Sequence, residues 1–159
     1  MTKPSLRYGY CAVALLICLL AGEARAAELV KVVDPWARAT VPGQKVGGVY
    51  MELVARQNLR LTGVKSVASE TAEVHQMKME KGMMRMRPVP FLDLPAGKPV
   101  KLAPGGYHIM LFDLKQSLVT GQKLKLELTV EDGSRHQHQV VVEALVRDRD
   151  AGTTGKHDH

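Results

Sequence analysis

The chain has 159 residues, with 22 Lys and Arg against 16 Asp and Glu and a net charge of +6 when its histidines are neutral. A surface that binds nucleic acid needs clustered basic residues and aromatic side chains on which bases can stack, whereas the one Trp, four Tyr and two Phe of this chain are spread along it. We therefore expect no nucleic-acid partner, and a length that suits one domain with a modest core.

Residues 1–26 have the three-part pattern of a secretory signal peptide. Lys3 and Arg7 precede an apolar run from Cys11 to Ala21, and Ala24-Arg25-Ala26 supplies the small residues of a cleavage site. The run is shorter than the roughly 20 apolar residues that a spanning helix needs. We predict cleavage after Ala26 and an exported mature chain that does not span a membrane; an uncleaved anchor is the alternative.

Both cysteines of the chain, Cys11 and Cys18, fall inside this predicted signal peptide. The mature chain then has no disulfide, no thiolate metal ligand and no Cys nucleophile. A copper site in an oxidising compartment would have to use Met and His instead.

Short runs of β-type composition recur along the mature chain and are separated by turn signals such as Pro95-Ala-Gly and Glu131-Asp-Gly. No stretch keeps an apolar period of 3.6 residues. The predicted strands are Leu29–Val33, Gly48–Val54, Arg60–Val67, Ala72–Met79, Met83–Val89, Val100–Leu102, Tyr107–Leu114, Lys123–Val130 and His136–Ala144. This pattern predicts one all-β domain over residues 27–146, an antiparallel sandwich or barrel.

Two segments are expected outside these strands. The segment that follows Val33 begins Asp34-Pro35-Trp36, which suggests a turn and then a loop, with Trp36 as a plug in the core. Residues 147–159 have no apolar anchor, so we expect a disordered tail that contains histidines.

Five of the eight methionines lie between Met77 and Met86. Lys81-Gly82 suits the two central positions of a hairpin turn, which would pair Met79 with Met84 and Met77 with Met86. The alternation of a strand then puts one set of side chains on one face: His75, Met77, Met79, Met84 and Met86. The other face would carry Lys78, Glu80, Met83, Arg85 and Arg87. A half-buried hairpin with Met as core filler and a soft-metal site are both open interpretations.

A second segment offers the same two residue types in alternation. His108 and Met110 lie two apart on a predicted strand, so their side chains share a face and can hold one ion together. Imidazole and thioether suit soft Cu(I), whereas zinc prefers thiolate, carboxylate or more imidazole, and calcium or magnesium prefers oxygen. The two segments together favour a Cu(I) site.

The order His75, ten residues, Met86, twenty-one residues, His108, one residue, Met110 reproduces the pattern H-x10-M-x21-H-x-M. With it, the flanking Met77–Val89 run and the Lys101–Met110 run, the chain resembles the PCu(A)C family of periplasmic copper chaperones. The resemblance covers essentially the whole mature chain. It implies a cupredoxin-like Greek-key antiparallel β-sandwich that is not an enzyme and holds one Cu(I) through His75, Met86, His108 and Met110.

The same resemblance implies a monomer in the periplasm that hands copper to the CuA domain of cytochrome c oxidase, alongside an Sco-type protein. The alternatives are a periplasmic copper-tolerance or copper-storage protein and a β-sandwich assembly module that binds no metal. A copper redox carrier is disfavoured because the mature chain offers no Cys for a blue-copper site.

Further candidate ligands lie outside the four-residue signature. Met77, Met79 and Met84 are candidates for auxiliary thioether ligands. His157 and His159 flank Asp158, and imidazole with carboxylate suits the harder Cu(II), so these histidines are candidates for a second, weaker Cu(II) site. A solvated tail without metal is the alternative.

Overall fold

The computed structural model describes residues 29–148, and the ten elements in that range are all strands. The strands are β1 (Val30–Arg38), β2 (Val46–Ala55), β3 (Leu59–Ser66), β4 (Ser69–Glu80), β5 (Met83–Pro88), β6 (Leu92–Leu94), β7 (Pro99–Leu102), β8 (Tyr107–Leu114), β9 (Lys123–Asp132) and β10 (Gln137–Arg147). The nine predicted strands are all present. The three-residue β6, which the sequence analysis did not predict, pairs with β3.

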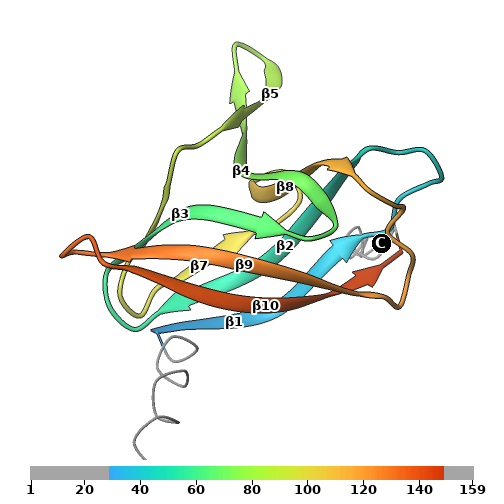
Figure 1. The fold of residues 1–159 in the computed structure, drawn as a ribbon. Helices are drawn as coiled ribbons and strands as arrows, with labels where there is room; N and C mark the ends of the chain where they lie inside the picture. Colours follow the sequence, from blue (N-terminus) through green and yellow to red (C-terminus); the bar gives the residue numbers. More distant parts are fainter. Residues whose placement is uncertain (1–28, 149–159) are drawn as a thin grey trace, which may run out of the picture.

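The strands form one sheet in the order β5-β4-β8-β7-β2-β1-β10-β9-β3-β6, and β8 also pairs with β2. The sheet folds over, so that β3, β9 and β10 lie in front of β2, β7 and β8, and the hairpin of β4 and β5 stands out from the body (Figure 1). The pairings of β1 with β10 and of β7 with β8 are parallel. The predicted all-β sandwich is confirmed, with a mixed sheet in place of a wholly antiparallel one.

The core lies between the two layers and follows from alternation along the strands. In β9, Leu124, Leu126, Leu128 and Val130 are buried and alternate with more exposed residues, as expected of strands with one face on the core. Each such side chain contributes about 1.5–3 kcal/mol when fully buried. Every described strand except β5 supplies at least one buried apolar residue, whereas all six residues of β5 are exposed. Most of the methionine-rich hairpin therefore lies outside the core.

β1 continues through the segment that we expected to be a turn and loop. Its register against β2 shifts between Val33 and Trp36, and Asp34 has a left-handed backbone with φ of 46°. A bulge of this kind accommodates Pro35 and lets the strand resume. Trp36 packs on Tyr50 with 4.5 Å between the ring centroids and is buried, as predicted.

β10 ends one residue after the predicted domain boundary at 146. Arg147 pairs in parallel with Arg38 of β1, and its guanidinium forms an ion pair with the Asp34 carboxylate. These contacts keep Arg147 in the strand. Among residues 29–148, no helix is long and apolar enough to cross a membrane.

Candidate metal centre

The turn that joins β4 to β5 fixes the register of the methionines. Lys81 and Gly82 have φ of 51° and 78°, the positive values that a two-residue type I′ turn requires at both central positions. Met79 then pairs with Met84, and Met77 with Met86. The predicted hairpin register is confirmed.

β4 lies between β5 and β8, and this arrangement joins the two candidate segments. His75 of β4 is directly opposite His108 of β8, and Met110 is opposite Glu73 of β4. Side chains opposite one another or two apart along a strand share a face of the sheet. His75, Met86, His108 and Met110 therefore lie on one face of three adjacent strands.

Both histidines are buried and keep one ring nitrogen available. The Nδ1–H of His108 donates to the Gly106 carbonyl oxygen at 3.1 Å, which leaves the Nε2 lone pair without a proton. The Nε2–H of His75 donates to Oε2 of Glu73 at 2.9 Å, and Nδ1 of His75 is buried without a hydrogen-bond partner among residues 29–148. A ligating histidine commonly donates its second N–H to a carbonyl or carboxylate in this way. The two imidazoles, with centroids 6.2 Å apart, are thus prepared to ligate.

The protonation state of His108 suits the same role. Burial lowers the pKa of its imidazole below the ordinary value of 6.5; the hydrogen bond to Gly106 opposes this shift, and the nearby His75 adds to it. A metal ligand must be the neutral imidazole. His108 is therefore held in its ligating form at neutral pH.

A cleft of about 300 Å³ opens beside His108. Met86, Met110 and Met77 line it, together with Tyr50 and other residues of β1, β2, the loop between them and the turn before β8: Arg38, Gln44, Val46, Gly47, Gly48, Pro104 and Gly105. His75 does not line this cleft and packs instead between His108 and Phe112, whose ring centroid is 5.6 Å away. Three of the four predicted ligands thus face the cleft, and the fourth lies next to His108.

Tyr50 and Gly48 also belong to the wall of the cleft, although neither was predicted from the sequence as a site residue. The Tyr50 ring lies between Trp36 and His108, with centroid distances of 4.5 Å and 6.4 Å. A Cβ atom on Gly48 would lie 2.8 Å from Oη of Tyr50, so the ring occupies this position because Gly48 has no side chain. The signal in the sequence was weak: two residues that share one face of a predicted strand.

Arg38 is a further wall residue that was not predicted from the sequence. Its guanidinium carbon lies 5.9 Å from the centroid of the Tyr50 ring, and its Nε is buried without a hydrogen-bond partner among the described residues. The cleft therefore contains a positive charge beside its imidazole and thioether groups.

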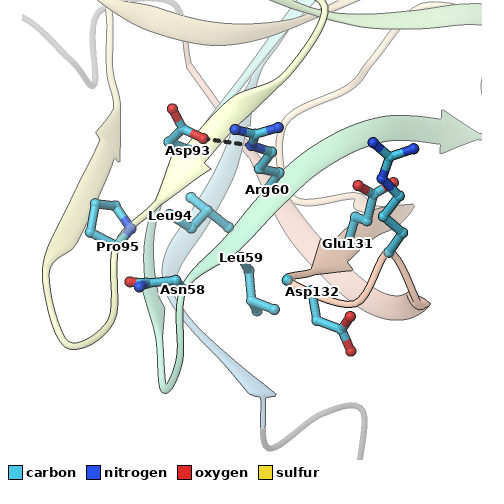
Figure 2. Close-up of a pocket in the computed structure, with 10 residues that line it drawn as sticks. Asn58, Leu59, Arg60, Asp93, Leu94, Pro95, Glu131 and Asp132 are labelled. Carbon is cyan, nitrogen blue, oxygen red and sulfur yellow. Dashed lines mark hydrogen bonds and ion pairs between the residues drawn. The ribbon is translucent and has the colours of Figure 1, made fainter.

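A larger hollow of about 540 Å³ lies elsewhere, between β3, β6 and the end of β9. Figure 2 shows the ion pair between Arg60 and Asp93, neighbours on the paired strands β3 and β6. The distance from Arg60 Nε to Asp93 Oδ1 is 3.0 Å, and Asn58, Glu131 and Asp132 also line the hollow. The polar side chains here offer oxygen and nitrogen atoms, and no Met of the described residues lines the hollow. Within residues 29–148, no three His, Cys, Asp or Glu residues are grouped to hold a metal.

Of the candidate auxiliary ligands, the three hairpin methionines lie within the described residues and the two tail histidines do not. Met77 is partly buried at the cleft, while Met79 and Met84 lie farther along the hairpin, where 60% and 49% of their surface is exposed. His157 and His159, the expected signal peptide of residues 1–26 and all but the first two residues of the expected tail lie outside the described residues.

The profile of the LpqE-like lipoprotein family matches residues 30–142. Lxx21020 of Leifsonia xyli subsp. xyli is 31% identical over 109 residues, which cover 68% of this chain and 66% of that protein. RP573 of Rickettsia prowazekii is also 31% identical over 109 residues, which cover 65% of this chain and 60% of that protein. The chain thus matches slightly less than two thirds of the length of each relative.

Solved structures of similar fold include copper-binding domains. A copper-bound PCuAC domain from PmoF2 aligns with a TM-score of 0.62 and 26% identity over 76% of this chain and 93% of that domain. DR1885 from Deinococcus radiodurans aligns in its apo form with a TM-score of 0.59 and 25% identity, over 96% of this chain and 95% of that one. Its Cu(I) form aligns with a TM-score of 0.56 and 26% identity, over 80% and 85%. The predicted cupredoxin-like fold is confirmed by these alignments.

Proposed function

The chain belongs to the LpqE-like family, and from that premise we propose that it is a copper chaperone that binds Cu(I) through His75, Met86, His108 and Met110. The ion is cargo, which the protein takes up and gives away. Its similarity to PCuAC domains solved with copper supports this proposal.

The observation that carries the proposal is the pair of buried imidazoles on adjacent strands, 6.2 Å apart between centroids, each of which uses one ring nitrogen in a hydrogen bond and keeps the other for a metal. Nδ1 of His75 is buried without a hydrogen-bond partner among the described residues, which costs about 1–3 kcal/mol of folding free energy in lost solvation. A bond from this nitrogen to a metal ion would offset that cost. Thioethers of Met86 and Met110 on the same face add soft donors, and soft donors select Cu(I) over hard ions.

The charge balance of the site also favours a monovalent ion. Two neutral imidazoles and two thioethers bring no negative charge into direct contact with the ion, and the Glu73 carboxylate that accepts from His75 is balanced by Arg38, which lines the cleft. Repulsion and desolvation both rise with the charge of the ion. Cu(I) is therefore accommodated more readily than Cu(II) or Zn(II).

Handing the ion on requires a ligand that a partner can reach. Met86 is 47% exposed, so an incoming thiolate or thioether can replace it while the histidines still hold the ion. We propose that the protein acts after export to the periplasm and cleavage near Ala26, as a monomer, and that its acceptor is the CuA domain of cytochrome c oxidase, with an Sco-type protein as second partner. A copper-tolerance or copper-storage protein would retain the ion instead.

The test of the ligand set is the double variant Met86→Ile, Met110→Ile. Ile keeps apolar volume while removing both sulfurs, so the fold should survive. We expect Cu(I) affinity, measured anaerobically against a competing chelator, to fall at least about 100-fold, since loss of even an outer partner of a metal site costs about 10- to 100-fold. Met51→Ile is the matched control because Met51 is a buried core residue, 3% exposed. Wild-type affinity in the double variant would refute the assignment.

The test of the acceptor is direct transfer. Cu(I)-loaded protein is mixed with an isolated CuA domain, and the metal on each is measured after separation. Movement of copper to the CuA domain supports delivery, and retention by the loaded protein supports the storage alternative.

A further inference from the structure

We propose that Met79 and Met84 form a second, outer Cu(I) site at the end of the β4–β5 hairpin, which the ion reaches from the inner site by way of Met77 and Met86. This inference rests on the proposed function for the identity of the ion. It assigns a role to thioethers that the four-ligand site does not use.

The hairpin register arranges four methionines as two successive cross-strand pairs on one face. Met77 is opposite Met86, and Met79 is opposite Met84. Residues directly opposite in an antiparallel pair have Cβ atoms about 4.5–5.5 Å apart, a distance that lets two flexible thioethers reach a common ion. Met86 belongs to the inner site and to the first of these pairs, so the two sites are adjacent.

These methionines have no role in packing the core. Met79 is 60% exposed and Met84 is 49% exposed, whereas Met51 of the core is 3% exposed. The interpretation of the hairpin as a half-buried pair with Met as core filler is therefore wrong for these positions. Strand positions on an exposed hairpin favour Thr or aromatic and β-branched residues, so folding alone does not account for Met here.

The opposite face of the hairpin has different chemistry. Glu80 accepts a hydrogen bond from Arg87 at 3.0 Å and lies 3.9 Å from Arg85, which ties the two strands together. Met83, directly opposite Glu80, is exposed on that charged face. The hairpin thus presents thioethers on one face and ion pairs on the other. Met83 is exposed as Met79 and Met84 are, but no methionine lies opposite it, so it serves as the control position.

Transfer between the sites needs only ligand exchange. A copper–sulfur bond to Met79 or Met84 forms as a bond to an inner ligand breaks, and the ion remains Cu(I) throughout, so no electron or proton is required. Two neutral thioethers bind more weakly than the inner set with its imidazoles. The outer site is consequently a place where the ion is briefly exposed to an acceptor.

The experiment compares Met79→Ile, Met84→Ile with Met83→Ile in the mature protein with labelled Met methyl groups. In the wild type, the first equivalent of Cu(I) should shift the methyl signals of Met86 and Met110, and the second those of Met79 and Met84. The outer double variant should keep the affinity for the first equivalent and lose the second. It should also release Cu(I) to a chelator about tenfold more slowly, which corresponds to a barrier higher by about 1.4 kcal/mol.

The Met83 variant should behave as the wild type does in both measurements. A second equivalent and a release rate that persist in the outer double variant would overturn the inference, as would equal losses in the Met83 variant. Failure of the proposed function has a different signature, because the signals of Met86 and Met110 would then not respond to the first equivalent.

Discussion

Substitution of Gly48 tests whether the position of the Tyr50 ring at the cleft depends on the absence of a side chain at residue 48. Substitution by Ala adds only a Cβ atom, at 2.8 Å from Oη and 3.2 Å from Cζ of Tyr50. Tyr50 is 8% exposed and is packed against Trp36 and near His108, so its ring has little space into which to withdraw. We expect Gly48→Ala to push the ring toward the cleft and lower Cu(I) affinity.

The magnitude follows from two opposing effects. Overpacking of a filled site costs about 1–3 kcal/mol, whereas replacing Gly by Ala within a strand recovers about 0.5–1 kcal/mol of conformational entropy. At the middle of both ranges the free energy of unfolding falls by about 1 kcal/mol, with limits of about 0 and about 2.5 kcal/mol. For a domain of this size, the melting temperature should fall by about 2–8 °C.

Gly63→Ala is the matched control. It also lies in a strand, and the nearest atoms to its added Cβ are those of Thr129 at 3.4 Å, an ordinary contact. Thermal unfolding and Cu(I) competition should show loss in the Gly48 variant only, and adding Tyr50→Phe, which removes the closest atom, should restore part of it. Equal stability of the two glycine variants, or no recovery with Phe, would refute the reasoning.

Two predictions concern pH. Protons compete with Cu(I) for imidazole, and burial lowers the pKa of His108 below 6.5. Cu(I) affinity should therefore hold from about pH 8 to 6.5 and weaken at lower pH. A competition titration that is flat between about pH 5 and 8 would contradict His108 as a ligand. The hydrogen bond from Arg147 lowers the pKa of Asp34 below 3.8. Replacing Asp34 by Asn, which tolerates positive φ, should therefore lower the free energy of unfolding by less than about 1 kcal/mol. Urea titrations should find this difference above pH 3.8 and lose it as pH falls through the lowered pKa, and a difference that persists in acid would exclude the ion pair as its cause.

The methionine hairpin was predictable because its information is local. Lys81-Gly82 specifies a turn that needs positive φ, and a two-residue turn leaves only one register for the strands beside it. Adjacent placement of His75 and His108 was not predictable from periodicity, since it depends on β4 pairing with β8 across many residues. The spacing pattern that resembles the PCu(A)C family was the indication that these two segments meet.

Elements that depend on long-range contacts escaped the sequence analysis. β6 has three residues, too few for a period to be visible, and it exists because β3 offers an edge for pairing. The continuation of β1 past Pro35 depends on a bulge against β2. Tyr50 becomes a wall residue because β2 lies beside β8, with Gly48 opposite Met110, and Arg38 joins it because β1 pairs with β2.

The parallel pairing of β1 with β10 has a mechanical consequence. The described chain enters at the start of β1 and leaves at the end of β10, and the two strands run in the same direction, with Trp36 opposite Leu145 and Arg38 opposite Arg147. Tension applied between these two points pulls the strands past one another in shear. The hydrogen bonds between them and the Asp34–Arg147 ion pair then bear the load together, instead of opening one after another as they would at a peeled hairpin. Under tension between these two points, the face that carries His75, Met86, His108 and Met110 therefore keeps its structure until the β1–β10 pairing breaks.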